Sequence, residues 1–171
     1  MTNTDLQSNE FGAYYANYIA LAGDDSLISG LISRLNEAVS LYESISEEQF
    51  NSAYAEGKWT IKELLLHVID SERVFAYRAL RIARKDKLNL LGFFQDDFVL
   101  ASDANNRGKA DLIKEFSLLR QSTIALFNSF DDNMLKEIGS ASDNPISVRA
   151  LGFIITGHEK HHSKIVSERY I

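Results

Sequence analysis

Two histidines near the C-terminus, His158 and His162, stand four residues apart in the segment GHEKHHSKI. Residues at positions i and i+4 share one face of an α-helix, so both imidazoles can be directed at one point. A third histidine, His67, lies in the separate segment KELLLHVID and can approach that point from a neighbouring helix. Three neutral imidazoles around one point form an open site for a divalent metal ion, with a position left for water or substrate. We therefore predict a metal site made of His67, His158 and His162.

The residues next to this trio suggest a single metal ion rather than a pair. His161, the only other histidine of the chain, is rotated about 100° from His162 on a helix, so we expect it at the rim or in solvent. Glu159 and His162 spell E-x-x-H, a motif of di-iron bundles, but such bundles need two of these motifs and two further glutamates. The motif occurs once here, which disfavours a di-iron site.

A structural explanation of the histidines stays open beside the metal site. His67 alone can be a core histidine that is hydrogen-bonded to a neighbour, and the later histidines can interact with the negative end of their helix. Buried imidazoles each need a partner, however, and one shared cation serves several of them. Asp70, one turn after His67, can orient a ligand imidazole, act as an acid or base, or simply be solvated.

Four long segments have apolar residues at every third or fourth position, a spacing typical of amphipathic helices. They cover approximately residues 27–44, 61–84, 109–130 and 148–169. His67 lies near the apolar face of the second segment, and His158 and His162 lie in the apolar stripe of the fourth. Charged residues from Glu72 to Lys85, Arg78 among them, predict a solvated face on the second helix.

Capping residues mark where these helices begin. Thr60 and Glu63 can form a capping box before the second helix, and Ser147 can cap the fourth. The single proline, Pro145, falls in the break GSASDNP that precedes the fourth helix. Trp59, just before the capping box, is better explained as a packing anchor than as a platform for substrate.

The link over residues 86–107 is long, and long connections are often functional. It carries Phe94, Asp96 and Asp97, which are candidates for the wall of a pocket beside the metal site. An ordinary loop packed against the bundle is the preferred alternative for these three residues. The length of the link also permits a crossover instead of a simple up-and-down order of helices.

These elements predict an all-α protein, a four-helix bundle with a long ordered link between its second and third helices. An aromatic segment near residues 11–23 predicts a short extra N-terminal helix, and residues 1–10 are expected to be frayed. With 171 residues, of which 45% are hydrophobic, the chain is expected to form a single domain over residues 1–171.

Composition argues against several classes of protein. A net charge of −6 disfavours sequence-independent binding of nucleic acid, which needs a basic surface. The absence of cysteine excludes disulfides and thiolate ligands, so a metal site must use His, Asp or Glu. The chain contains no run of about 18 apolar residues, so we expect no membrane-spanning helix. The N-terminal MTNTDLQSNE lacks the features of a signal peptide, so we expect a cytoplasmic protein.

Two segments, WTIKELLLHVID (59–70) and GHEKHHSKI (157–165), resemble the DinB/YfiT-like metalloenzyme family, the DinB superfamily. The stretches SERVFAYRALRIARKD, GFFQDDFV and SVRALGFIITGHEKHH are similar to one of its subfamilies, so the resemblance extends from about residue 27 onward. Family members have a metal-binding four-helix bundle with one histidine from the second helix and two from an H-x-x-x-H in the last. The matching positions here are His67, His158 and His162.

The resemblance implies a divalent metal cofactor and a small-molecule substrate. Imidazole ligands suit zinc, nickel, iron and copper, and of these zinc or nickel is expected. Characterised relatives include transferases and isomerases that use bacillithiol, mycothiol or glutathione, so the first hypothesis is a thiol-dependent S-transferase acting on a small electrophile. A metal-dependent hydrolase is the alternative reaction. A non-catalytic, metal-stabilised stress-response or binding protein, or an inherited site that is no longer used, also stays open. Bundles of this kind often pair, so a homodimer is plausible.

Overall fold

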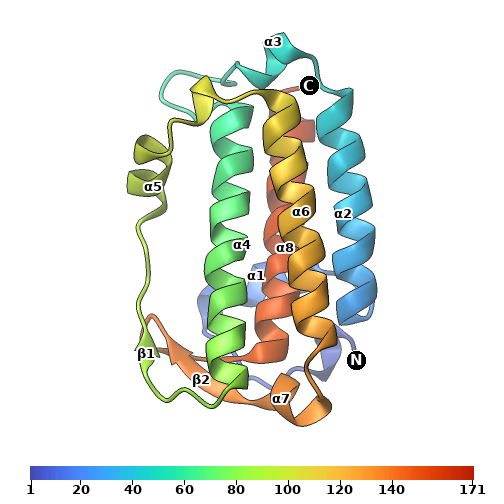
Figure 1. The fold of residues 1–171 in the computed structure, drawn as a ribbon, viewed down its shortest axis with the longest axis vertical. Coiled ribbons are helices and arrows are strands. Elements are labelled where there is room, and N and C mark those ends of the chain that lie inside the picture. The colour runs from blue at the N-terminus through green and yellow to red at the C-terminus, as the bar shows by residue number, and fades with distance from the viewer.

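Four long helices pack side by side and form the body of the protein (Figure 1). The structure is a computed structural model that describes residues 1–171. The long helices are α2 (Leu27–Ser44), α4 (Ile61–Ala83), α6 (Lys109–Asn128) and α8 (Val148–Arg169). The bundle predicted from apolar periodicity is confirmed, and each helix begins and ends within about two residues of its expected limits, the uncertainty usual for helix ends.

Capping explains two of the helix starts. The Thr60 hydroxyl accepts a hydrogen bond from the Glu63 backbone N–H at 3.2 Å, and the Glu63 carboxylate accepts one from the Thr60 backbone N–H at 2.8 Å. This is the predicted capping box of α4. At the start of α8, the Ser147 hydroxyl accepts a hydrogen bond from the Ala150 backbone N–H at 3.1 Å, also as predicted.

The order of helices in space differs from a simple up-and-down bundle. α8 packs against α2 and α4, and α6 packs against the same two helices, so α2 and α4 lie diagonally opposite. α2 and α8 run in one direction, and α4 and α6 run in the other (Figure 1). Because the neighbours α4 and α6 are parallel, the chain between them must return along the whole bundle. The crossover that the long link permits is therefore present.

The returning link is ordered, as predicted, and has short elements of its own. They are β1 (Asn89–Leu90), α5 (Gln95–Ala101) and a 3₁₀ turn over Ala104–Asn106. Two further short helices, α3 (Glu47–Phe50) and α7 (Asp132–Lys136), lie in the other connections of the bundle. The link passes along the outer side of α4, the helix that carries His67 (Figure 1).

A small three-stranded sheet closes one end of the bundle and was not predicted. β2 (Ile138–Ala141) pairs antiparallel with β3 (Asn144–Ser147) and parallel with β1. The hairpin turns at Ser142 and Asp143, both with positive φ, where Asn-Gly would be the recognisable sequence signal. Pro145 fits because β3 is an edge strand, where the lost N–H is tolerated.

The N-terminal segment covers one side of α8. It contains 3₁₀ turns at Asn3–Asp5 and Ala13–Tyr15 and the short helix α1 (Ala16–Leu21), which is the predicted extra helix. A Cβ added at Gly157 of α8 would lie 1.7 Å from the Tyr18 carbonyl oxygen, so only glycine permits this close approach.

Residues 1–10, which we expected to be frayed, make specific contacts instead. Glu10 is buried and accepts a hydrogen bond from the Arg149 Nε at 2.8 Å. The Asp5 backbone carbonyl accepts a second hydrogen bond from the same guanidinium at 3.1 Å. An ion pair between residues 139 positions apart cannot be seen in the local sequence pattern.

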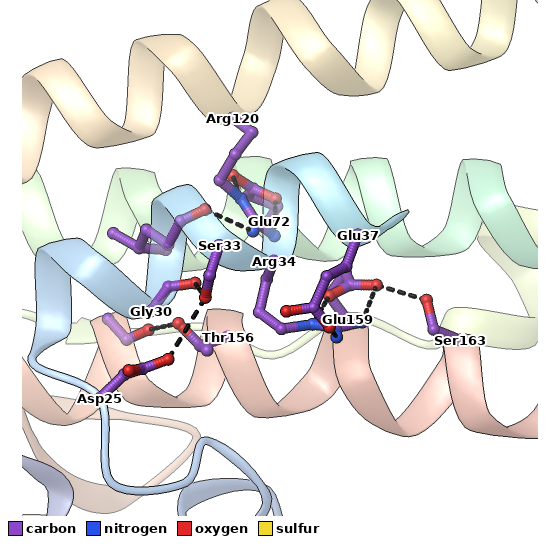
Figure 2. Close-up of polar contacts among 12 residues, drawn as sticks. Asp25, Gly30, Ser33, Arg34, Glu37, Glu72, Arg120, Thr156, Glu159 and Ser163 are labelled. Atoms are coloured by element: carbon purple, nitrogen blue, oxygen red, sulfur yellow. Dashed lines mark hydrogen bonds and ion pairs between the residues drawn. The ribbon is translucent and has the colours of Figure 1, made fainter. Parts of the chain in front are cut away.

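The apolar core consists of two clusters, one toward each end of the bundle, with a polar layer between them. In this layer Glu72 of α4 binds Arg120 of α6 through two hydrogen bonds of 2.8 Å, and both side chains are buried (Figure 2). Arg34 of α2 pairs with the buried Glu159 of α8 at 2.7 Å and 3.2 Å. The prediction of a solvated face was therefore wrong for Glu72, and also for Arg78, which is 2% exposed.

The Glu72–Arg120 pair should behave as one unit in folding. Replacing Arg120 with Met leaves a buried carboxylate without its partner, and we expect a loss of about 3–5 kcal/mol in the free energy of unfolding. The double variant Glu72→Met/Arg120→Met should recover most of that loss, because no charge stays buried. Urea unfolding measures the free energy of unfolding of both variants.

The control Arg73→Met, at a partly exposed ion pair, should cost less than about 1 kcal/mol. Equal losses for Arg73→Met and Arg120→Met would contradict the coupling.

Candidate metal centre

The three histidines predicted as ligands converge in the interior of the bundle. The Nε2 atom of His158 lies 3.2 Å from the Nε2 atom of His67 and 3.2 Å from that of His162. One ligand nitrogen from each ring lies within 4.8 Å of the other two. α4 supplies His67, α8 supplies the other two one helical turn apart, and the close packing of α4 against α8 brings them together.

All three rings are buried, with exposed fractions of 4% for His67, 6% for His158 and 9% for His162. Burial lowers the pKa of His67 to about 4. Burial also lowers the pKa values of His158 and His162 well below the ordinary value of a histidine, and the neighbouring imidazoles add to the effect. At neutral pH the rings are therefore uncharged, which is the form that coordinates metal ions.

The spacing of the three nitrogens fits a metal ion. Zinc binds imidazole nitrogen at about 2.0–2.1 Å with tetrahedral geometry, which places two ligand nitrogens about 3.3 Å apart. The two Nε2–Nε2 separations of 3.2 Å are close to this value. No fourth His, Asp or Glu belongs to the cluster, so the donor set is that of an open site.

Aromatic neighbours hold the rings in place. The Nδ1 atom of His162 is buried without a hydrogen-bond partner, so packing rather than a second hydrogen bond orients this ring. The ring of Trp59 lies 5.0 Å from that of His67, centroid to centroid, and the ring of Tyr18 lies 5.3 Å from that of His158. Trp59 thus contacts the candidate site as a packing residue.

Other residues named from the sequence have different positions. His161 packs against Tyr18 outside the cluster, in agreement with the expected rim position. Asp70, for which the sequence leaves open both a role beside a ligand imidazole and simple solvation, pairs with Arg73 at 3.2 Å, and Arg73 also binds Glu115 of α6. Side chains three residues apart on a helix are neighbours, and Arg73 supplies a charge that a neutral imidazole cannot.

Glu159, the acidic residue of the E-x-x-H motif, also points away from the histidines. Its carboxylate is fully buried and is bound by Arg34 and by the Ser163 hydroxyl (Figure 2). Both of its oxygens are therefore engaged on the side of the helix that faces α2. A di-iron site, which the sequence disfavours, needs a second carboxylate motif. The cluster in the structure contains three histidines and no carboxylate.

A cavity of about 420 Å³ opens beside His67 and His158. The predicted wall residues Phe94 and Asp96 line it, whereas Asp97 does not. A smaller cavity of about 260 Å³ adjoins His162, and Asp96 lines that one too. The histidine cluster therefore lies between two openings, with the link crossing beside it.

Several lining residues were missed from the sequence. On α4, Ser71, Phe75 and Arg78 follow His67 on the same face and all reach the large cavity. Extending the helical stripe from His67 by steps of three and four residues would have found them. Ser142 and Asn144 line the cavity because the unpredicted hairpin places them there, and no local sequence pattern predicts this position.

Comparison with known proteins agrees with the fold. The sequence profile of the DinB superfamily matches residues 32–166. A protein of Oceanobacillus iheyensis, provisionally named a metal-dependent hydrolase, is 25% identical over 132 residues, which cover 76% of this chain and 73% of that protein.

Two solved structures from Bacillus subtilis have the same fold. YfiT, described as a probable metal-dependent hydrolase with an unusual four-helix bundle topology, matches with a TM-score of 0.71 at 14% identity, over 95% of this chain and 90% of its own. The DinB-like protein YjoA matches with a TM-score of 0.60 at 20% identity, over 84% of this chain and 87% of its own.

The buried histidines should make the chelator-treated protein sensitive to acid. Between about pH 6.5 and 4 the unfolded chain binds more protons than the folded one, so stability is present above this window and is lost as the pH falls through it. His67 alone should contribute roughly 3 kcal/mol to this loss. Urea unfolding at pH 7.5 and pH 4.5 measures it. His67→Gln should flatten the dependence more than His161→Gln, a less buried ring. An equal slope in wild type and His67→Gln would contradict the assignment.

Proposed function

The chain belongs to the DinB superfamily, and from this premise and its three converging imidazoles we propose that it is a metal-dependent enzyme acting on a small molecule. The observation that carries the proposal is the 3.2 Å spacing of the Nε2 atoms at the wall of a cavity. A closed structural site would have a fourth protein ligand and no opening. Here the cluster has three histidines and adjoins two cavities.

His67, His158 and His162 would hold the cation through their Nε2 atoms. A divalent cation held there would supply Lewis acidity, which would lower the pKa of a thiol or of water and so make either a nucleophile at neutral pH. The protein contributes neutral ligands and a cavity with aromatic lining residues that would position the second reactant. Zinc or nickel as the cation and pairing into a homodimer stay predictions.

The first specific reaction is thiol-dependent S-transfer, which the family resemblance implies. The sulfur of a low-molecular-weight thiol would form a bond to an electrophilic carbon held in the cavity. The leaving group would depart with its electron pair, and the proton released from the thiol would balance its charge. A cavity of about 420 Å³ with an aromatic wall is within the size range of small-molecule sites.

Hydrolysis is the second candidate, and two observations favour it. The Oceanobacillus relative and YfiT carry descriptions as metal-dependent hydrolases. Asp96, whose charge acts on His67, lines both cavities and is the carboxylate best placed to accept a proton from an attacking water molecule. In S-transfer the same carboxylate would instead act on the leaving group or the thiol.

Single substitutions test the ligand set. We expect Ala at His67, His158 or His162 each to weaken metal binding more than about tenfold, because a site with three protein ligands cannot lose one without losing its geometry. His161→Ala should retain metal. Elemental analysis of protein prepared without an affinity tag, after dialysis against zinc or nickel, measures the content. An equal loss of bound metal in all four variants, or no bound metal in the wild type, would contradict the assignment of the three ligands.

A second experiment separates the reactions. Protein loaded with zinc or nickel is assayed for coupling of glutathione or bacillithiol to a chromogenic aryl halide, and for hydrolysis of a nitrophenyl ester without thiol. We expect thiol coupling that falls more than about tenfold on chelation while the helical circular dichroism persists, as for a catalytic metal. Thiol-independent hydrolysis with the same chelator sensitivity would establish the hydrolase instead. Unfolding on chelation without either activity would indicate a structural metal.

A further inference from the structure

We propose that the cavity beside the three histidines takes an elongated small molecule with a carboxylate or phosphate group at one end, and that Arg78 binds this group. The inference deepens the proposed function, since it rests on this cavity being the substrate site. It concerns the end of the cavity away from the histidines, where the sequence predicted only a solvated charge.

Arg78 differs from the other arginines of the interior in having no counter-ion. Three of the arginines that are buried or nearly so each pair with a carboxylate, namely Arg34 with Glu159, Arg120 with Glu72 and Arg149 with Glu10. Arg78 is 2% exposed and forms no ion pair with any carboxylate. This contrast within one molecule separates Arg78 from the arginines whose role is to neutralise a buried acid.

The contacts that Arg78 does make leave donors free. One terminal nitrogen donates to the Leu91 carbonyl oxygen at 2.7 Å and lies 3.4 Å from the Ser142 hydroxyl. The Nε atom is buried and has no hydrogen-bond partner. Removing a cation from water is costly when only neutral acceptors replace it. An anionic ligand in the cavity would supply both the missing charge and an acceptor for the planar guanidinium.

The geometry of α4 sets the length of the ligand. His67, Ser71, Phe75 and Arg78 follow one another on one face of the helix and all line the cavity. Eleven residues of helix separate the first from the last, which is about 16 Å along the axis. A molecule that contacts both ends must be elongated, with its reactive atom near the histidines and its anion near Arg78.

Charge is distributed unevenly along this path. Asp96, the only carboxylate that lines the cavity, also lines the smaller cavity beside Trp59 and His162, so it lies at the histidine end. The Arg78 end is formed by the β2–β3 hairpin, which contributes the uncharged Ser142 and Asn144. Between the two ends the wall is aromatic, with Phe75 and Tyr15 in edge-to-face contact. An anion with an apolar body matches this order of groups.

A purely structural role is the competing explanation. Arg78 ties the link at Leu91 and the hairpin at Ser142 to α4, and this could be its whole contribution. The two roles differ in one measurable respect, because a structural tie has no reason to respond to an anion in solution.

The experiment measures binding of defined probes to the full chain in the presence of a chelator, so that no metal takes part. The probes are 4-phenylbutyrate, its neutral amide and inorganic phosphate. Calorimetry measures the affinity of each probe, and nitrogen-15 NMR follows the Arg78 Nε–H signal. Arg78→Met removes the charge, and Arg78→Lys keeps it. Arg84→Met is the control at an exposed arginine that directly follows α4 and lies outside the cavity lining. The lysine variant also serves to assign the Arg78 signal.

We expect 4-phenylbutyrate to bind wild type and Arg84→Met equally, to shift the Arg78 Nε–H signal, and to bind Arg78→Met at least about tenfold more weakly. The amide should not bind detectably. Competition by phosphate would identify phosphate esters as acceptable ligands, and its absence would restrict the class to carboxylates. Equal binding by Arg78→Met, equal binding of the amide, or no saturable anion binding to wild type would each overturn the proposal. Because the metal is absent, these outcomes are independent of whether the histidines hold one.

Discussion

The structure depends on how polar groups are neutralised in the middle of a helical bundle. Between two apolar clusters lie two arginines, two glutamates and three histidines that water hardly reaches. A buried charge is tolerated only when it is paired and hydrogen-bonded. Both ion pairs are hydrogen-bonded and so meet this condition, Glu72 with Arg120 and Arg34 with Glu159. The histidines meet it by losing their charge, and the Nε2 atom of His158 then lies within hydrogen-bond distance of the other two, beside a cavity.

The crossover topology determines which side of that layer is accessible. Because α4 and α6 run parallel, the link that joins them must pass along α4, and it brings Phe94 and Asp96 to the cavity beside His67. α1 closes against α8 at Gly157, where a side chain would collide with the Tyr18 carbonyl oxygen. A simple up-and-down bundle would need no such long link, and the histidines would face only other helices.

The sequence predicts the parts of this arrangement that are local. Apolar periodicity and the caps at Thr60 and Ser147 locate the long helices, because each signal lies within a few residues of its effect. The convergence of His67 with His158 and His162 follows from helical spacing and the family pattern. The charged partners do not follow, since Glu72 and Arg120 are 48 residues apart and Arg34 and Glu159 are 125 apart. A charged residue on a helix therefore looks solvated until its distant partner is known, which is why Glu72 was misassigned. Arg78 was misassigned for another reason, because the link and the hairpin bury it at Leu91 and Ser142.

The charges that remain unpaired favour one kind of chemistry. Three neutral imidazoles contribute no negative charge, so a divalent cation that they hold keeps its full charge toward the cavity. Arg78 adds a second positive group to the same wall, and Asp96 is the only acidic group that opposes them there. The interior pairs on the far side of α4 and α8 are already neutral and cannot compensate. A cavity with this balance would favour anions, both a nucleophile formed by loss of a proton near the histidines and the carboxylate or phosphate that we propose binds Arg78.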